Sequence, residues 1–229
     1  MEGMMHERIG KLVERLQGYI ESGQPVTLDS AFSAMTADII IRRFFGEHFD
    51  YLDMPDFKQP VEGAFFGVSL IFHVARFIPG LAYTLIKMPI PIIRMILPPV
   101  ADVLVLQRVI KPKILASFED ASKEEEESKA IDRLIDEGTT IIVAGTVTSA
   151  RALSVGMFHL LNDKTKLQKL RDELKQLPFK PDNDYSMAQL EPLPYLTPLS
   201  QSTYFVHTDP DIYPDPWTFD PERWIEGCE

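Results

Sequence analysis

Cysteine is nearly absent from this sequence, since Cys228 is the only one among 229 residues. A single cysteine excludes a disulfide framework and any metal site built from several cysteines. Because stable disulfides are typical of oxidising compartments, their absence favours an intracellular protein. The first residues are polar and lack the charged-then-apolar order of a secretory signal peptide.

Basic charge and long apolar runs are also scarce. The chain has 23 Lys and Arg against 34 Asp and Glu, which gives a net charge of −11. This charge argues against nucleic-acid binding, because contacts to phosphates need a basic surface. No run of eighteen apolar residues occurs, so we predict no transmembrane segment. With 45% hydrophobic and 25% charged residues, the composition is that of an ordinary folded protein.

Apolar residues at helical spacing are what the sequence has instead. The first such segment, residues 7–21, places its apolar side chains in one stripe that we expect to be buried. The second begins near Asp29 or Ser30, either of which can cap it, and Gly46 is placed to end it. Asp38, inside this segment, is expected to be a partly exposed acid without a catalytic role. Further helices are predicted over residues 128–161 and 164–177, and as a single turn after Ser186.

The central helix, residues 128–161, has a weak middle. Gly145 is followed by Thr146, Thr148 and Ser149, which are poor or indifferent helix formers. Gly145 lets another group approach the backbone, and Thr148 can bond back to the carbonyl three or four residues earlier. The pattern predicts a notch with hydroxyls along one wall. A core helix packed closely on a neighbour explains the same residues.

Residues 56–110 combine phenylalanines with many prolines, and prolines break helices, so several short helices are expected there. An apolar, aromatic and irregular segment suits a ligand-pocket cover, a membrane-surface contact or plain core. Prolines also forbid long helices over residues 191–229, where residues 202–206 read as one short strand. The predicted fold class is therefore mainly α, with at most one or two short strands near the C-terminus.

Three stretches resemble the cytochrome P450 family, in the style of its fungal microsomal members that serve secondary metabolism. Residues 144–149 resemble the oxygen-activation motif of the long central helix. Residues 207–216 and 219–224 resemble the H-x-D-P-x-x-x-x-D-P and F-x-P-E-R-W stretches. The resemblance implies heme as cofactor, a reductase as electron donor and insertion of one oxygen atom into a small lipophilic substrate. It also implies a location at the endoplasmic reticulum membrane, although the family's membrane anchor is not in this sequence.

The resemblance also implies roles for individual residues. Thr148 aligns with the threonine that relays protons to iron-bound oxygen. The groove facing oxygen and heme would be formed by the residues beside it. Arg223 aligns with a structural arginine of an ion-pair network. The phenylalanines of the proline-rich part match the segment covering the substrate pocket. The groove residues are Ala144, Gly145 and Ser149, and the pocket residues are Phe65, Phe66 and Phe72.

Two family features are missing and one is altered. No F-x-x-G-x-x-x-C-x-G loop occurs, so Cys228 is rejected as the heme ligand and no metal ligand is assigned. No E-x-x-R helix follows Tyr195, as if an internal piece had been removed between Thr197 and Pro198. Val147 replaces the acid of the central motif. We therefore expect a partial P450-like domain over residues 1–229, with mid-chain helices over 7–190 and a Pro-rich segment over 191–229.

Such a chain is expected to be truncated and inactive. The alternative from another class is a non-catalytic helical protein that acts, if at all, through a partner or a membrane surface. The apolar stretch over residues 63–106 motivates that alternative.

Overall fold

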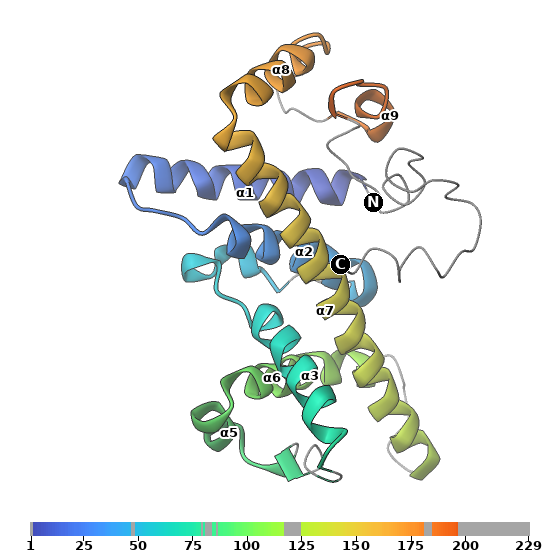
Figure 1. Cartoon of the computed structure of the whole chain (residues 1–229). Helices are drawn as coiled ribbons and strands as arrows, with labels where there is room; N and C mark the ends of the chain where they lie inside the picture. Colours follow the sequence, from blue (N-terminus) through green and yellow to red (C-terminus); the bar gives the residue numbers. More distant parts are fainter. Residues whose placement is uncertain are drawn as a thin grey trace, which may run out of the picture. The chain divides into compact units, whose positions relative to one another are not determined.

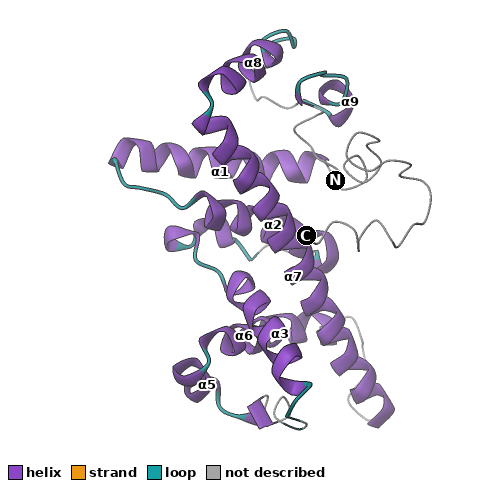
Figure 2. Ribbon diagram, in the orientation of Figure 1, coloured by secondary structure: helices purple, strands orange, loops and turns teal. Residues whose placement is uncertain are grey.

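A computed structural model describes residues 2–46, 49–78, 80, 84, 85, 87–116, 125–180 and 185–196. All regular structure within these residues is helical (Figure 2), which confirms the mainly α fold class. The predicted strand at residues 202–206 lies outside them. The elements in order are α1 (Glu2–Ser22), α2 (Leu28–Phe45), the 3-10 turns η1 (Tyr51–Asp53) and η2 (Pro55–Phe57), α3 (Pro60–Ala75), α5 (Ile90–Ile96), α6 (Pro98–Ala116), α7 (Glu125–Asn162), α8 (Lys164–Leu174) and α9 (Met187–Leu190).

Helix α2 ends as predicted and begins differently. Gly46 adopts a left-handed conformation with φ of 78° and donates its N–H to the carbonyl of Arg42, which closes the helix. The N-cap residue is Thr27, whose side chain makes no capping bond, rather than Asp29 or Ser30. The carboxylate of Asp29 is directed to α7 instead, where it accepts a hydrogen bond from Ser154. A partner distant in sequence thus outcompetes the local cap.

Asp38 is fully buried, so the expectation of a partly exposed acid was wrong. Its carboxylate accepts hydrogen bonds from the backbone N–H groups of Tyr51 at 3.0 Å and Leu52 at 3.3 Å. These are the first two N–H groups of η1, which have no partner inside that turn. The guanidinium of Arg8, also buried, lies 3.7 Å away. Burial raises the pKa of the Asp38 carboxyl, and the N–H groups and Arg8 oppose that shift.

The apolar stripe of α1 is only half buried, contrary to prediction. Leu12 is in the core, and the buried residue one turn before it is Arg8. Ile9, Val13 and Ile20 are 42%, 57% and 80% exposed. The contact face is rotated because Arg8 is drawn inward by Asp38 and by Asp50, which lies 3.2 Å away.

Helices α3 and α6 lie in close contact through two glycines one turn apart (Figure 1). A methyl group added at Gly67 would come within 2.6 Å of the backbone carbonyl carbon of Pro99 and 2.7 Å of the Val103 side chain. One added at Gly63 would overlap the carboxylate of Asp102. The lack of side chains at these two positions is therefore what permits the close approach.

The chain divides into two units, Met1–His159 and Leu160–Glu229, with α7 continuing through the boundary. In the second unit, α8 begins at Lys164 as predicted, and Asp163 caps it by accepting from the N–H groups of Thr165 and Lys166. Ser186 opens α9 with a reciprocal capping box to Gln189, also as predicted. The buried Glu173 accepts from the N–H groups of Tyr195 and Leu196 at 2.7 and 2.8 Å, which fixes the end of the described chain onto α8.

Among the described helices, α7 alone is long and apolar enough, over Lys129–Asn162, to cross a membrane. The sequence-based expectation of no such segment rested on the absence of unbroken apolar runs. It overlooked that Thr, Ser and Gly, which interrupt α7, barely lower a helix's average hydropathy. Length and composition are weak evidence, because core helices of soluble proteins share them. One face of α7 packs against α2.

Candidate functional site

Helix α7 has one face inside the protein and one open face. Ile142, Thr146 and Ala150, each four residues after the last, are buried. On the other side, Ala144 and Thr148 are exposed. The exposed apolar residues Ile141 and Val155 continue this open strip in both directions along the helix.

Thr148 donates its hydroxyl hydrogen to the carbonyl oxygen of Ala144, at 2.8 Å. This is the back-bond to the preceding turn that the sequence predicts. Thr140 makes the same bond to the carbonyl of Asp136, and the Ser154 hydroxyl oxygen lies 2.8 Å from the carbonyl oxygen of Ala150. The predicted groove residue Ala144 and the predicted proton relay Thr148 therefore share one face and are hydrogen-bonded to each other.

The other two predicted groove residues do not lie on this open strip. A methyl group at Gly145 would come within 3.0 Å of the Ile40 side chain, so the glycine makes room for α2. Thr146 is buried and its carbonyl lies 3.2 Å from the Thr36 hydroxyl, while its own hydroxyl has no hydrogen-bond partner among the described residues. Ser149 is exposed but lies about 100° around the helix from Thr148. The expected wall of hydroxyls is thus distributed around α7.

A polar cluster next to the strip joins α2, α3 and α7. The Asp29 carboxylate accepts from the Ser154 hydroxyl at 2.8 Å and lies 3.5 Å from the Arg151 guanidinium. Glu62, in the first turn of α3, is hydrogen-bonded to Asp29. Burial raises the pKa of Glu62, the Asp29 carboxylate raises it further, and Arg151 opposes the shift.

We expect the variant Glu62→Gln to reduce the pH dependence of stability. A raised pKa means that the folded chain holds a proton that the unfolded chain releases, so this stabilisation is lost as the pH rises through the raised value. Removing the carboxyl should raise the unfolding free energy at neutral pH, by less than about 1 kcal/mol because the site is partly hydrated. Urea unfolding at mildly acid and neutral pH measures the slope. Glu14→Gln, at an exposed position of α1, is the control. If the unfolding free energy of Glu62→Gln changed with pH as much as that of the unmodified chain, the raised pKa of Glu62 would be contradicted.

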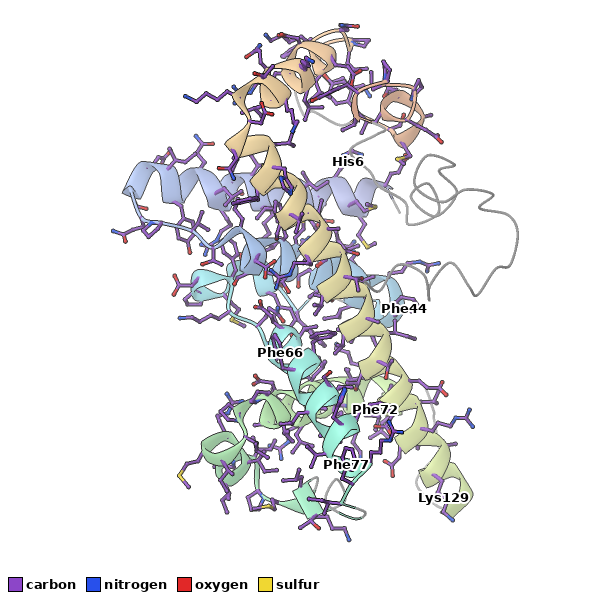
Figure 3. The ribbon with its side chains drawn as sticks, viewed as in Figure 1. His6, Phe44, Phe66, Phe72, Phe77 and Lys129 are labelled. Carbon is purple, nitrogen blue, oxygen red and sulfur yellow. The ribbon has the colours of Figure 1, made fainter. Side chains whose placement is uncertain are left out.

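Of the three phenylalanines predicted to line the substrate pocket, one lines a groove in the structure and two do not. Phe65, Phe66 and Phe72 are all on α3 and all exposed, and Figure 3 shows Phe66, Phe72 and Phe77 following one another along this part of the chain. Phe72 lines a groove of about 610 Å³, whereas Phe65, Phe66 and Thr148 do not.

The groove is formed by α3, α6 and α7 and is mostly apolar. Three polar side chains interrupt its wall, and Gln107 donates its amide hydrogen to Asp136 at 2.9 Å. Asp136 and Gln107 were not singled out in the sequence, because they lie 29 residues apart on different helices. The lining residues are Val68, Ile71, Phe72, Arg76, Val103, Leu104, Gln107 and Asp136.

Two predicted residues lie outside the described part of the chain. Arg223, expected in an ion-pair network, and Cys228, rejected as a metal ligand, both belong to residues 197–229. Within the described residues, no group of three or more His, Cys, Asp or Glu side chains could hold a metal ion.

Comparison with known proteins gives a consistent set of relatives. A family model described as Cytochrome P450 matches residues 1–199. The chain is similar to cytochrome P450 monooxygenase TRI4 of Trichoderma arundinaceum, with 39% identity over all of this chain and 54% of the relative. Cytochrome P450 monooxygenase SAT11 of Stachybotrys chartarum is 38% identical with the same coverage, and astB of Aspergillus terreus is 33% identical over all of this chain and 56% of its own length.

No solved structure gives a significant match. The chain spans about half the length of the curated relatives it matches. Because the family model covers residues 1–199 of these 229 residues, the chain belongs to the cytochrome P450 family.

Proposed function

We propose that this chain supplies the oxygen-side helix and pocket-cover helices of a heme-thiolate monooxygenase that oxidises a small lipophilic substrate. The observation that carries this proposal is the open strip of α7, where Thr148 and Ala144 are exposed together between apolar neighbours. A hydroxyl at the surface of an apolar strip can hold and pass a proton next to a bound apolar molecule. Electrons would come from a reductase partner.

The described residues fit one side of a heme. An exposed strip of small and apolar side chains on α7 can lie against a flat, apolar ring, and Thr148 places a hydroxyl within it. When bound, heme supplies the activation of oxygen. The described residues contain no cysteine, so the thiolate that would ligate the iron is not among them. These residues would therefore lie against the bound cofactor and would not supply the thiolate ligand of its iron.

A missing internal segment is part of the proposal. The alignment with the Trichoderma relative spans 282 positions against 229 residues here, so at least 53 positions of the relative have no counterpart. The family match stops at residue 199, next to the junction of Thr197 and Pro198. The unmatched positions are numerous enough to contain the E-x-x-R helix, and the end of the family match beside this junction supports its loss there. Sequencing the transcript across these two codons tests the loss of this segment. If the template is continuous there and offers no alternative exon, a longer form of the protein that contains the segment is contradicted.

We predict that the 229-residue chain by itself does not form a thiolate-ligated heme. Iron bound without its cysteine thiolate lacks the strong ligand that the family requires. The purified chain is mixed with hemin, reduced and treated with CO, and its Soret band is recorded. A relative such as the Trichoderma enzyme, treated identically, provides the positive control. A red-shifted Soret band typical of thiolate ligation in the chain alone would overturn the prediction.

Membrane association belongs to the same proposal. Family members of this type act at the endoplasmic reticulum, and the exposed Phe77, Met95 and Ile96 would suit contact with a lipid surface. With a net charge of −11, the chain would be attracted by apolar contact rather than by anionic lipid headgroups.

A further inference from the structure

Two acidic side chains meet where α2, α3 and α7 come together. Asp29 is in the first turn of α2 and Glu62 is in the first turn of α3, and their carboxyl groups are hydrogen-bonded to each other. An ionised carboxylate can only accept hydrogen bonds, so a bond between two carboxyl groups needs a proton on one of them. The contact between these two helix ends therefore depends on a shared proton.

The surroundings of the pair place this proton on Glu62. The Ser154 hydroxyl donates to the Asp29 carboxylate at 2.8 Å, and the Arg151 guanidinium lies 3.5 Å from it, so Asp29 is the acceptor of the cluster. Glu62 is then the donor. Burial and the charge of Asp29 both raise the pKa of Glu62, and Arg151, whose side chain is 65% exposed, opposes them.

A second link at the start of α3 contains no titrating group. Gln59 caps α3 by accepting from the N–H group of Val61, and its amide donates to the Ser33 hydroxyl of α2 at 2.8 Å. Amides and hydroxyls keep these bonds at every pH in the physiological range. The N-terminal end of α3 thus stays tied to α2 by Gln59 whatever the protonation of Glu62.

Other charged groups around this turn have partners of their own. On α6, Asp102 fills the space beside Gly63 and lies 3.5 Å from Arg94 of α5. Before α3, Lys58 pairs with the exposed Asp56 at 3.1 Å. Burial raises the pKa of the Asp102 carboxyl, and Arg94 opposes this shift. A pH effect on the start of α3 therefore has a second candidate source, which a variant of Asp102 can separate from the first.

We propose that Asp29 and Glu62 form a proton-dependent latch that fastens the first turn of α3 to α2 and α7. With the proton in place, Glu62 donates to Asp29 and the turn is held. Once the proton leaves, two like charges face each other and the turn loosens around the Gln59 link. Because the pKa of Glu62 is raised, the latch is closed at acid pH and opens as the pH rises through that raised value.

The latch also affects α6, because α3 contacts α6 closely through Gly67. How firmly the first turn of α3 is held to α2 therefore determines how firmly this helix pair is held. The latch needs no heme, so it holds or fails independently of the monooxygenase proposal.

Hydrogen–deuterium exchange of the 229-residue chain at mildly acid and at neutral pH tests the latch. The amides of Ala64, Phe65 and Phe66 are followed, since their helical bonds go to the carbonyls of the first turn. Each exchange rate is divided by the rate of an unstructured peptide at the same pH. In the unmodified chain, these amides should exchange about fivefold faster at neutral pH, which is the effect expected from the loss of one hydrogen bond.

Three variants identify the group responsible. Glu62→Gln has an amide that donates to Asp29 at every pH, so the three amides should be protected equally at both pH values. Glu62→Ala has no donor and should exchange fast at both. Asp102→Asn removes the other buried carboxyl beside α3 and should retain the fivefold difference. Circular dichroism confirms that each variant retains its helices. The proposal is overturned if the unmodified chain shows no pH difference, if Glu62→Gln retains it, or if Asp102→Asn abolishes it.

Discussion

Asp38→Ala is expected to lower the free energy of unfolding by about 3–5 kcal/mol, which is the range measured when one partner of a buried ion pair is removed. The variant leaves the guanidinium of Arg8 buried beside a cavity. It also leaves the N–H groups of Tyr51 and Leu52 without their acceptor. Since η1 has no other side-chain cap, the turn that follows α2 should loosen as well. Urea unfolding followed by circular dichroism measures the loss.

Two further variants separate charge from hydrogen bonding at this site. Asp38→Asn retains one acceptor oxygen in nearly the same shape, so it should recover part of the stability lost in Asp38→Ala. Asp53→Ala removes an exposed carboxylate that pairs with Lys11 in the same region, and it should cost less than about 1 kcal/mol. If Asp38→Ala lowered the free energy of unfolding as little as Asp53→Ala, the pair of Arg8 and Asp38 would contribute little to stability and its burial would be contradicted.

Gly67→Ala is expected to destabilise the protein by about 1–3 kcal/mol through overpacking. The new methyl group meets the backbone of Pro99, at the start of α6, and a backbone cannot move aside as the end of a side chain can. Helices α3 and α6 must therefore separate, which also opens the groove beside Val103. For a chain of this length, such a loss corresponds to a fall of about 2–12 °C in the unfolding midpoint.

Gly156→Ala is the matched control for this substitution. Gly156 also lies inside a helix, α7, but nothing lies within 4 Å of the position where its methyl group would be. Alanine is the better helix former by roughly 1 kcal/mol, so this variant should be slightly stabilised. Opposite signs for the two variants are the expected result. A stabilised Gly67→Ala would show that α3 and α6 do not approach each other as closely as described.

Local signals in the sequence were sufficient to predict most of the helices. Gly46 ends α2, Asp163 begins α8 and Ser186 begins α9, because each acts on backbone groups within a few residues. The prolines were less informative. The prediction of several short helices holds for α5, with 7 residues, but α6 runs for 19 residues because Pro98 and Pro99 stand at its start, where a missing N–H costs nothing.

Contacts between distant residues could not be predicted in this way. Asp38 was expected at the surface because its partners, Arg8 and the N–H groups of η1, are remote in sequence and only the fold unites them. The α7 strip was predicted in part. The pattern predicted the back-bond of Thr148, which the structure contains, but it could not indicate that Gly145 accommodates Ile40 of α2.

The back-bond of Thr148 gives its hydroxyl a direction. The single hydrogen of this group is occupied by the Ala144 carbonyl at 2.8 Å, so only oxygen lone pairs are available to an approaching molecule. A water molecule can therefore dock there by donating, while a ketone or ether cannot. For the hydroxyl to give its own hydrogen away, it must first rotate and leave that carbonyl. In the proposed relay role, reception and release of a proton by Thr148 would consequently be sequential events, with a rotation of the hydroxyl between them.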